Sequence, residues 1–446
     1  MNESADSVII MAAGDGSRLN SSTPKVFHKI GGLSLLGHVV NSAKKINPRE
    51  IIAVVKPSYK NLEQELGDDV KIARQETPLG TGDAVKCGLN IAAADDLGWV
   101  YILYGDIPLV SPETLRKLSA VEKCPKTGVV VLAMEAENSS ELGKLEFGNG
   151  AGTIKSIREE KGVSSEFDGT AQLCNAGLLV KKNLLRQFVN EMQSSAVTGE
   201  FYVTDVVRMA HEAGHVCRYH QGSAEELAGA NTRAELALLE KYFQNKMREK
   251  CLSNGVTLIA PETVFFSHDT IVEKDVLIHP YVVFLENVRL KSGAEIGPFC
   301  VLEGSEVRGA KIGPFARLRA GSKIGDGVKI GNFVEVKNSA IAENAKINHL
   351  SYVGDSEVGK NSNVGAGTIT CNYDGVSKHR TVIGENVFVG SNAALVAPVR
   401  VCDGATIGAG SVITEDVENG ALAVARGTQR NIKNWTRTSR NSKGKR

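Results

Sequence analysis

The first half of the chain alternates apolar runs with helical patterns. The runs, which contain few polar side chains, are SVIIMAA (7–13), IIAVV (51–55), WVYILY (99–104) and TGVVVLAM (127–134). Such runs are apolar on both faces of an extended strand, which is typical of buried parallel strands in a sheet that helices cover on both sides. The pattern therefore predicts an α/β domain over residues 1–231.

Residues 232–252 show the period of an amphipathic helix. Their apolar side chains recur three and four positions apart, at Leu236, Leu239, Phe243 and Met247. Thr232 and Glu235 have the spacing of a capping box, which marks the start of a helix. We expect a long linker helix in this segment.

From residue 253 onward the apolar positions recur every six residues. Three series keep this period: Ile278, Phe284, Leu290, Ile296 and Leu302; Ile312, Leu318, Ile324, Ile330 and Val336; and Ile383, Val389, Leu395, Val401, Ile407 and Ile413. One inward aliphatic residue per hexad is the signature of a parallel β-helix, so the pattern predicts this fold for the domain 253–446. With three hexads per coil, residues 255–420 would form roughly nine coils. The repeat breaks at TCNYDGVSKHRT (370–381), which is predicted to project as a functional loop.

Composition narrows the classes of partner. A chain of 446 residues is expected to form at least two domains. Lys plus Arg (52) nearly equals Asp plus Glu (51), so no charge bias points to nucleic acid or a membrane surface. Eight cysteines without a CxxC pair, and no leader or long apolar run, predict reduced thiols in a cytoplasmic protein that does not insert into membranes. The basic end WTRTSRNSKGKR (435–446) is expected to be a disordered, solubilising tail.

The stretch IIMAAGDGSRLNSSTPK (9–25) raises the first question of chemistry. Directly after a predicted strand it contains two glycines, Arg18 and Lys25, which suits a loop whose backbone N–H groups and cations face a phosphate. It lacks the GxxxxGK[ST] of the P-loop, and Leu19 replaces the third glycine of the dinucleotide fingerprint. The spacing alone leaves a phosphate cradle and a merely structural turn equally open.

Three motifs carry a family resemblance. AAGDGSR with the following Pro24-Lys25, LGTGDA (79–84) and YGDIPL (104–109) resemble the signature of sugar-1-phosphate nucleotidylyltransferases. The hexads resemble the left-handed β-helix of hexapeptide-repeat acyltransferases, and the handedness comes from that resemblance. Nearly the whole chain resembles the bacterial bifunctional enzymes that join an N-acetylglucosamine-1-phosphate uridylyltransferase to a glucosamine-1-phosphate N-acetyltransferase. The fold class that this implies is α/β, a Rossmann-like nucleotidylyltransferase domain followed by a left-handed parallel β-helix.

The resemblance implies two reactions. The C-terminal domain would acetylate glucosamine-1-phosphate with acetyl-CoA, and the N-terminal domain would transfer UMP from UTP to N-acetylglucosamine-1-phosphate, releasing pyrophosphate and feeding cell-wall precursor synthesis. Because charge builds on the phosphoryl oxygens during in-line attack, Arg18 and Lys25 are predicted to stabilise the transferred phosphoryl group and the leaving pyrophosphate. Asp106 and Asn231 are implied as ligands of Mg²⁺, a cation that prefers oxygen.

The same resemblance assigns the remaining contacts of the first site. Residues implied to bind the nucleotide or the sugar are Met11, Ala12, Ala13, Gly14, Lys25, Gln75, Gly80, Thr81, Tyr104, Gly105, Asp106, Gly143, Glu159, Asn175, Tyr202, Thr204 and Asn231. The uracil edge is expected to be read by an amide and by backbone groups. Three positions depart from the usual family pattern: Asp83 stands where a His is common, Lys144 where an Arg is expected, and Ala320 where a Pro is common.

A second site is predicted on the β-helix. His349, in KINHLSYVGD, is a lone histidine at an otherwise aliphatic turn. Acetyl transfer to an amine needs a base that titrates near neutral pH, as imidazole does, although the residues alone favour a structural histidine. By the resemblance His349 is the base, and the sugar phosphate ligands are Arg319, Lys337, Tyr352 and Asn363. Residues implied to hold acetyl-CoA or to complete the site are Ala366, Asn372, Tyr373, Ser391, Ala409 and Arg426. The resemblance also implies a homotrimer whose sites are shared, with loop 370–381 reaching a neighbouring chain.

The sequence allows three other interpretations of function. HEAGH (211–215) fits the HExxH pattern of zinc proteases, but Gly214 followed by the strand-like VCRYH predicts that the helix ends there. The chain could also be a nucleotidylyltransferase whose β-helix only oligomerises.

A regulatory exchange-factor subunit without enzyme activity would share the two-domain architecture. Arg18, Lys25 and Asp106 argue against it, because such a subunit is expected to lack an intact phosphate loop. His349 and Asn363, with the inserted loop, argue against a β-helix that is only a scaffold.

Overall fold

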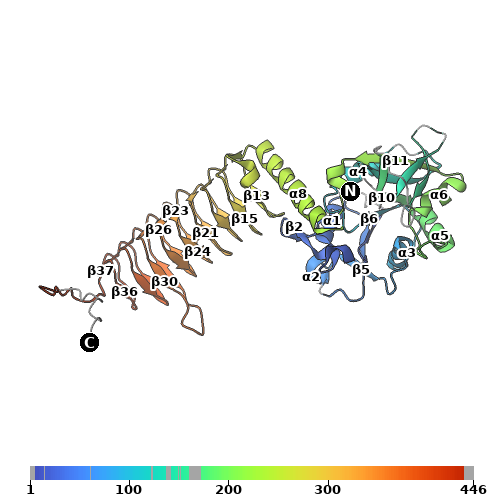
Figure 1. Cartoon of the computed structure of the whole chain (residues 1–446). Coiled ribbons are helices and arrows are strands. Elements are labelled where there is room, and N and C mark those ends of the chain that lie inside the picture. Colours follow the sequence, from blue (N-terminus) through green and yellow to red (C-terminus); the bar gives the residue numbers. More distant parts are fainter. Residues whose placement is uncertain are drawn as a thin grey trace, which may run out of the picture. The chain divides into compact units, whose positions relative to one another are not determined.

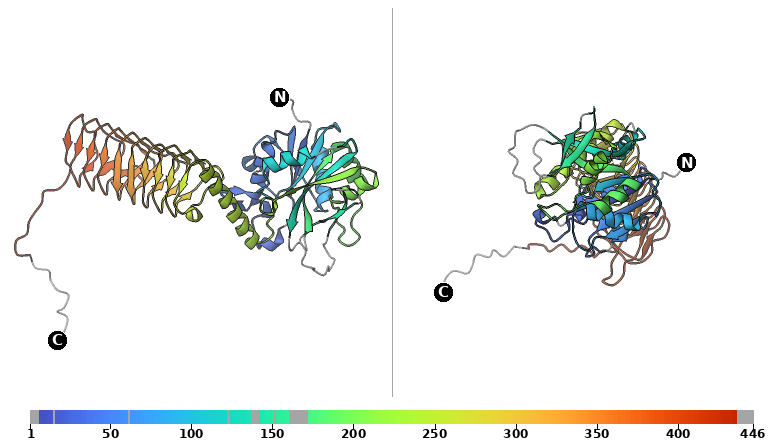
Figure 2. Two further views of the ribbon diagram at one scale, coloured as in Figure 1. Left: turned by 90° about the horizontal axis from the view of Figure 1, so that it is seen from above. Right: turned by 90° about the vertical axis from the view of Figure 1, so that its right-hand side faces the viewer.

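The computed structural model divides into two compact units, residues 1–247 and 248–446, and Figures 1 and 2 show their elements. Residues 6–435 are described, apart from 15, 61, 122–123, 137–141, 149, 151 and 160–171. Residues 436–446 of the predicted tail therefore lie outside the described residues.

Unit 1 is built on a nine-stranded mixed sheet, whose main path runs β11-β7-β10-β6-β1-β4-β5. The strands are β1 (Ser7–Met11), β4 (Glu50–Val55), β5 (Val70–Arg74), β6 (Trp99–Tyr104), β7 (Thr127–Ala136), β8 (Lys144–Phe147), β9 (Ile154–Arg158), β10 (Gln172–Lys181) and β11 (Val216–Gly222). The four predicted strands are all present and point the same way. The sequence patterns did not predict β10, which runs antiparallel to both β6 and β7.

Helices cover both faces of this sheet. One layer contains α1 (Leu35–Lys44), α2 (Leu62–Leu66), α4 (Pro112–Ala120) and α7 (Ala224–Leu227); the other contains α3 (Thr81–Ile91), α5 (Lys182–Glu191) and α6 (Asp205–Glu212). Successive residues of β1 alternate between the two layers, since Val8 and Ile10 pack into the first and Ile9 and Met11 into the second. A strand buried on both faces must be apolar throughout, which explains the unbroken apolar runs.

The helix α8 (Arg233–Ser253) begins with the predicted capping box. The backbone N–H of Glu235 donates to Thr232 Oγ1 (3.2 Å), and Glu235 Oε2 accepts from the backbone N–H of Thr232 (2.9 Å). Leu239 and Phe243 are buried in a small core of unit 1. The division between the two units falls inside this helix, after Met247.

The HEAGH segment does not form one helix. As predicted from Gly214, α6 ends at Glu212 and β11 begins at Val216. His215 therefore lies outside the helix, whereas the HExxH arrangement needs both histidines on one helical face.

Unit 2 is a β-helix of three parallel sheets, which are called here face 1, face 2 and face 3 in chain order. Face 1 contains β12 (Thr257–Leu258), β14 (Leu277–Ile278), β17 (Glu295–Ile296), β20 (Lys311–Ile312), β23 (Lys329–Asn332), β26 (Lys346–His349), β29 (Asn363–Val364), β32 (Phe388–Val389), β35 (Thr406–Ile407) and β37 (Leu422–Ala423). Face 2 contains β15 (Val283–Phe284), β18 (Val301–Leu302), β21 (Arg317–Leu318), β24 (Glu335–Lys337), β27 (Tyr352–Gly354), β30 (Ile369–Cys371), β33 (Ala394–Val396) and β36 (Val412–Ile413). Face 3 contains β13 (Ile271–Val272), β16 (Arg289–Leu290), β19 (Glu306–Val307), β22 (Lys323–Ile324), β25 (Ala340–Ile341), β28 (Ser356–Val358), β31 (Thr381–Ile383) and β34 (Val399–Val401).

The core of the β-helix confirms the six-residue pattern, because every residue of the three predicted series is buried. The phase change between the first two series has a simple cause. From Leu302 through Val307 to Ile312 the inward residues are five apart, so two turns are each one residue shorter than usual. The insertion 370–381 projects beside β30, as predicted (Figure 1).

The corner between face 1 and face 2 carries a stack of exposed aromatic rings. Tyr281, Phe299, Phe315 and Phe333 occupy equivalent turn positions, and neighbouring ring centroids lie 5.0, 4.8 and 5.3 Å apart. We call this row the aromatic ladder. Stacked rings in successive coils stabilise the solenoid beyond the burial of area.

Candidate active sites

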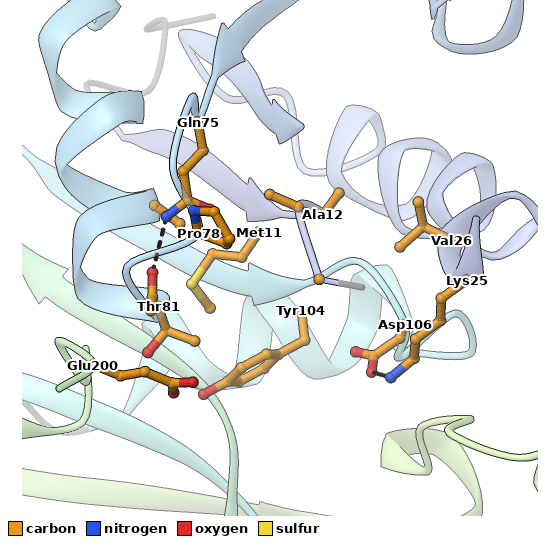
Figure 3. Close-up of a pocket in the computed structure, with 14 residues that line it drawn as sticks. Met11, Ala12, Lys25, Val26, Gln75, Pro78, Thr81, Tyr104, Asp106 and Glu200 are labelled. Atoms are coloured by element: carbon orange, nitrogen blue, oxygen red, sulfur yellow. Dashed lines mark hydrogen bonds and ion pairs between the residues drawn. The ribbon is translucent and has the colours of Figure 1, made fainter. Parts of the chain in front are cut away.

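Unit 1 contains a cavity of about 480 Å³, within the range typical of small-molecule sites. It lies where β1 and β6 end, the edge at which open α/β sheets bind ligands. The lining residues are Met11, Ala12, Ala13, Gly14, Lys25, Val26, Gln75, Pro78, Gly80, Thr81, Ala84, Tyr104, Asp106 and Glu200. Figure 3 shows Gln75 and Thr81 at one end, Lys25 and Asp106 at the other, and Met11 between.

Three residues distant in sequence meet at the Lys25 end. Lys25 opens the short 3-10 helix η2 (Lys25–Phe27), Asp106 follows β6, and Asn231 lies just before α8. The Lys25 ammonium forms an ion pair with Asp106 Oδ2 and donates a hydrogen bond to Asn231 Oδ1 at 2.5 Å. The Lys25 side chain is 11% exposed, so the pair is partly shielded from water.

The oxygen atoms at the Lys25 end could also bind a metal ion. The oxygens of Asp106 and Asn231 converge on one point, and a cation, the Lys25 ammonium, already occupies it. Among the described residues no group of three or more His, Cys, Asp and Glu side chains gathers to hold a metal ion. One carboxylate and one amide oxygen fit a hard cation that takes its other ligands from water and phosphate, as Mg²⁺ does.

The Gln75 end of the cavity is held by hydrogen bonds to backbone groups and to the Asp83 side chain. The Gln75 amide nitrogen donates to the Gly80 carbonyl (3.1 Å) and to Asp83 Oδ2 (2.8 Å). Thr81 begins α3, and its Oγ1 accepts from the backbone N–H of Val203 (3.0 Å). The LGTGDA motif is therefore a strand-to-helix turn that closes one end of the cavity.

The residues implied to bind the sugar form a connected group beside Tyr104. Asn175 donates from Nδ2 to the Tyr104 hydroxyl (2.9 Å) and from its backbone N–H to the Gly143 carbonyl (2.8 Å). Thr204 donates to Glu159 Oε1 at 2.7 Å. Burial, and then the nearby carboxylates of Glu159 and Asp106, raise the pKa of Tyr104, so its hydroxyl remains protonated and available as a donor.

The other predicted residues of this site lie around the cavity without lining it. Gly105 donates its backbone N–H to the Met11 carbonyl (2.9 Å), and the Tyr202 hydroxyl contacts Thr198 Oγ1 (2.9 Å). Arg18 is exposed on the 3-10 helix η1 (Ser17–Leu19). Sequence reasoning missed four lining residues, Val26, Pro78, Ala84 and Glu200. Val26, Pro78 and Ala84 sit within or beside the quoted motifs, whereas Glu200 lies outside them.

In unit 2 the structure gathers several predicted residues into one column. His349, Ala366, Ser391 and Ala409 are each the second residue after the inward aliphatic residue of face 1 in four consecutive coils. We call this row the His349 column; it continues the corner that carries the aromatic ladder. Arg426 closes its far end by donating to the Ala409 carbonyl at 2.8 Å.

The preceding coil contributes a partner for the histidine. Asn332 pairs with His349 in register, and its Oδ1 lies 2.7 Å from His349 Nδ1. Because this oxygen only accepts, it favours the tautomer of the neutral imidazole in which Nδ1 carries the hydrogen and Nε2 has the lone pair. His349 is exposed, so Nε2 is accessible to a proton donor.

Face 2 presents a charged group, which includes Asp355 at the corner between face 2 and face 3. Arg319 pairs with Glu335 (2.9 Å) and Lys337 with Asp355 (3.5 Å). Partial burial by itself would raise the pKa of Asp355. Hydrogen bonds from Asn338 and from its ion-pair partner Lys337 help to lower this pKa.

The inserted loop completes this group. Asn372, a buried residue of the loop, donates to Asp355 and lies 3.5 Å from the Tyr352 hydroxyl. The neighbouring positive charge of Lys337 lowers the pKa of Lys378. A position beside two lysine side chains favours an anion. Sequence reasoning missed Lys378 and Asp355, although Lys378 lies in the quoted loop.

Two predicted ligands lie apart from this group. Asn363 opens β29 on face 1, with Val364 inward, so its side chain faces outward on a different face from Tyr352 and Lys337. Tyr373, at 60% exposure, points away from the core of its own chain. The single chain therefore does not bring all the predicted acetyltransferase residues together.

The comparisons with known proteins cover both units. The family model of the MobA-like NTP transferase domain matches residues 8–245, the GMPPB C-terminal domain matches 307–397, and the bacterial transferase hexapeptide (six repeats) matches 380–415. A solved structure, the inositol-1-phosphate CTP transferase from T. maritima, is 15% identical over 56% of this chain with a TM-score of 0.42, too weak a likeness to bear on function. No helix among the described residues is long and apolar enough to cross a membrane.

Curated relatives match along almost the full length. The Bifunctional protein GlmU of Paracoccus denitrificans is 44% identical, over 96% of this chain and 96% of its own. The proteins of the same name from Wolbachia pipientis and Azorhizobium caulinodans are 43% and 41% identical, over 94% and 100% of this chain and 97% and 99% of theirs. On this coverage the chain belongs to the family of bifunctional GlmU proteins, which join a nucleotidyltransferase domain to a hexapeptide-repeat acetyltransferase domain.

Proposed function

We propose that the cavity of unit 1 and the His349 column of unit 2 are the two active sites of this enzyme. The enzyme acetylates glucosamine-1-phosphate with acetyl-CoA and transfers UMP from UTP to N-acetylglucosamine-1-phosphate, releasing pyrophosphate. The observation that carries the assignment is the meeting of Lys25, Asp106 and Asn231 at one end of a cavity whose other end presents Gln75. A cationic end and an amide end match the two ends of a nucleoside triphosphate.

For uridylyl transfer, the chain positions the reactants and neutralises charge. A phosphate oxygen of the sugar phosphate attacks the α-phosphorus of UTP, the bond to the bridging oxygen breaks, and pyrophosphate leaves. Lys25 would face the phosphoryl oxygens on which charge develops, and Arg18 would approach from η1. Preorganised cations of this kind usually supply much of the rate enhancement.

Mg²⁺ would be held by Asp106 and Asn231. When bound it would supply positive charge to the phosphate oxygens. Lys25, which contacts both oxygens, would then be free to turn toward the triphosphate. Among the residues of the sugar pocket, Asn175, Glu159 and Thr204 would bind the hydroxyl and acetamido groups.

For acetyl transfer, His349 would act as the base. Its Nε2 accepts a proton from the ammonium of glucosamine-1-phosphate, and the neutral amine attacks the thioester carbon while CoA leaves as the thiol. From His349 to Ala409 is three coil steps, roughly 14 Å at ~4.8 Å per coil. An extended pantetheine arm suits such a column, with Arg426 near the phosphates of CoA.

The sugar phosphate would lie against face 2. Arg319, Lys337 and Lys378 supply positive charge, and a phosphate between the two lysines would relieve the repulsion that lowers the pKa of Lys378. Tyr352 and Asn372 would border the sugar.

The enzyme is proposed to be a homotrimer. Asn363 lies on face 1 and the cations lie on face 2, so a neighbouring chain is the natural source of the missing ligand at each site. The exposed aromatic ladder and the loop residues Tyr373 and Val376, 60% and 88% exposed, offer apolar surface for such a neighbour to cover. We also propose a cytoplasmic location, which fits eight free cysteines.

A coupled assay tests both assignments. Purified chain receives glucosamine-1-phosphate, acetyl-CoA, UTP and Mg²⁺, and each product is measured. Lys25→Met should accumulate N-acetylglucosamine-1-phosphate, whereas His349→Ala should leave the sugar unacetylated. The matched controls are Lys29→Met, at an exposed lysine close to Lys25 in sequence, and His279→Ala, at a half-buried histidine in an earlier coil of the β-helix; both should behave as wild type.

The outcomes separate the two sites. If wild type uses supplied N-acetylglucosamine-1-phosphate but never consumes acetyl-CoA, the β-helix is only a scaffold. If Lys25→Met retains full uridylyl transfer, the cavity is not the site of that reaction.

A further inference from the structure

The cavity contains an interaction that the family resemblance does not predict. Asp83, which stands where a histidine is common, accepts a hydrogen bond from the Gln75 amide nitrogen at 2.8 Å. The same nitrogen donates to the Gly80 carbonyl at 3.1 Å, a bond marked by the dashed line at Gln75 in Figure 3. Gln75 is 5% exposed and lines the cavity.

These two partners determine which way the amide points. A carboxylate oxygen and a backbone carbonyl oxygen only accept hydrogen bonds, so the end of the amide that faces them must be the nitrogen. The reversed amide would set its oxygen against two oxygens and leave its nitrogen unpaired, which is costly in a buried group. Both hydrogens of the nitrogen are therefore used.

The carbonyl oxygen of Gln75 is what remains for a ligand. Among the described residues it has no hydrogen-bond partner. Asp83 lies in the first turn of α3, where the helix dipole favours a negative charge. The carboxylate is thus well placed to hold the amide in one orientation.

An acceptor that faces N3 of the base distinguishes between the two pyrimidines of ribonucleotides. Uracil carries a hydrogen on N3 between two carbonyl groups, so it can donate to Gln75 Oε1. Cytosine has a lone pair on N3, which the oxygen would repel. A site built around one hydrogen bond strongly rejects the analogue that cannot make it.

We propose that Asp83 is a positioning residue that sets base specificity: it holds the Gln75 amide so that only its oxygen faces the base, which admits uracil and excludes cytosine. The inference rests on the proposed function of the cavity as the UTP site. Asp83 touches no substrate and acts through Gln75.

The test compares kcat/KM for UTP and CTP, with N-acetylglucosamine-1-phosphate as acceptor. In Asp83→Asn the new amide can turn its own nitrogen toward Gln75, and the fixed orientation is lost. The UTP-to-CTP ratio should fall at least about tenfold, by loss for UTP and gain for CTP. Glu76→Gln, which removes an exposed neighbouring charge, is the matched control and should keep the wild-type ratio.

A second measurement asks whether Asp83 acts through Gln75. Gln75→Ala should lower the same ratio, and adding Asp83→Asn to it should change the ratio no further, because two residues of one interaction are not additive. Asp83→Ala replaces the asparagine variant if that variant fails to fold.

Each result decides the matter. An equal loss for UTP and CTP in Asp83→Asn, or an unchanged ratio, overturns the inference, as does a wild-type enzyme that uses both nucleotides equally well. A wild-type enzyme that consumes no UTP contradicts the proposed function instead. A fall in the ratio confined to the Asp83 and Gln75 variants supports the inference.

Discussion

Gly80→Ala should disable uridylyl transfer through backbone geometry alone. Gly80 has φ +109°, and a Cβ added there would lie 2.5 Å from the Phe201 carbonyl oxygen and 2.8 Å from the Phe201 nitrogen. The two segments are joined at this point, because the N–H of Gly82 donates to the Phe201 carbonyl (2.7 Å) and the N–H of Phe201 to the Leu79 carbonyl (2.8 Å). An added methyl group must separate them.

The size of the effect follows from these contacts. The backbone conformation costs a residue with a side chain about 1–3 kcal/mol, and each of the two lost hydrogen bonds contributes about 1 kcal/mol. The sum, about 3–5 kcal/mol, corresponds to a fall of roughly 100- to 4000-fold in the population of the correct loop, at ~1.4 kcal/mol for each factor of ten. The loop carries Thr81 and the carbonyl that holds Gln75.

The assay is kcat/KM for UTP, with acetyl transfer measured on the same sample. Gly199→Ala is the control, since Gly199 has φ +73° but nothing within 4 Å of an added Cβ. Gly199 also has a positive φ but lacks the collision, so the loss should be limited to the backbone strain, about 1–2 kcal/mol, and uridylyl transfer should fall far less than in Gly80→Ala.

Acetyl transfer should be unchanged in both variants. If Gly80→Ala keeps kcat/KM for UTP within fivefold of wild type, or if Gly199→Ala loses as much, the reasoning from the Phe201 contact is refuted.

Three further predictions concern other parts of the molecule. Asn332→Ala should lower the acetyltransferase kcat about tenfold and alter its pH profile. The reason is that general-base catalysis contributes at least 10²-fold and Asn332 no longer holds the tautomer of His349. An unchanged pH profile would contradict this. Asp355→Asn should unfold at a lower temperature than wild type at pH 6, and this difference in unfolding temperature should shrink as the pH falls below about 4. A carboxyl group with a lowered pKa stabilises the fold only at a pH above its pKa in the unfolded chain. A difference that stays constant from pH 6 to 3 would contradict this reasoning. Lys182→Met should leave the free energy of unfolding equal or raise it by up to about 2 kcal/mol in urea titrations. Among the described residues the fully buried Lys182 ammonium has no hydrogen-bond partner, and Glu50, 3.8 Å away, keeps its ion pair with Lys71 at 2.8 Å in the variant, so no buried carboxylate is left unpaired. A marked loss of stability would show that the ion pair matters more than its desolvation.

Much of the fold can be read from the linear order of residues. The period of six in unit 2 and the unbroken apolar runs of unit 1 are local patterns, because each reflects how one strand meets the core. They predicted the β-helix, the projecting loop and four parallel strands. The capping box at Thr232 likewise depends only on neighbours along the chain. The antiparallel strand β10 was not predicted. The direction in which a strand runs depends on its pairing partners and not on its own sequence pattern.

The chemistry of the sites depended on contacts between distant segments. Motifs indicated Lys25 and Asp106, but only the fold brings Asn231, more than a hundred residues away, to the same ammonium group. His349 and Asn332 come into contact only because neighbouring coils stack and place one residue directly above the other. Asp83 was visible in the sequence merely as a departure from a pattern, because a hydrogen bond between Gln75 and a helix that follows it has no linear signature. Local periodicity determines which elements form, whereas long-range packing decides which polar groups meet, and catalysis and specificity depend on the second.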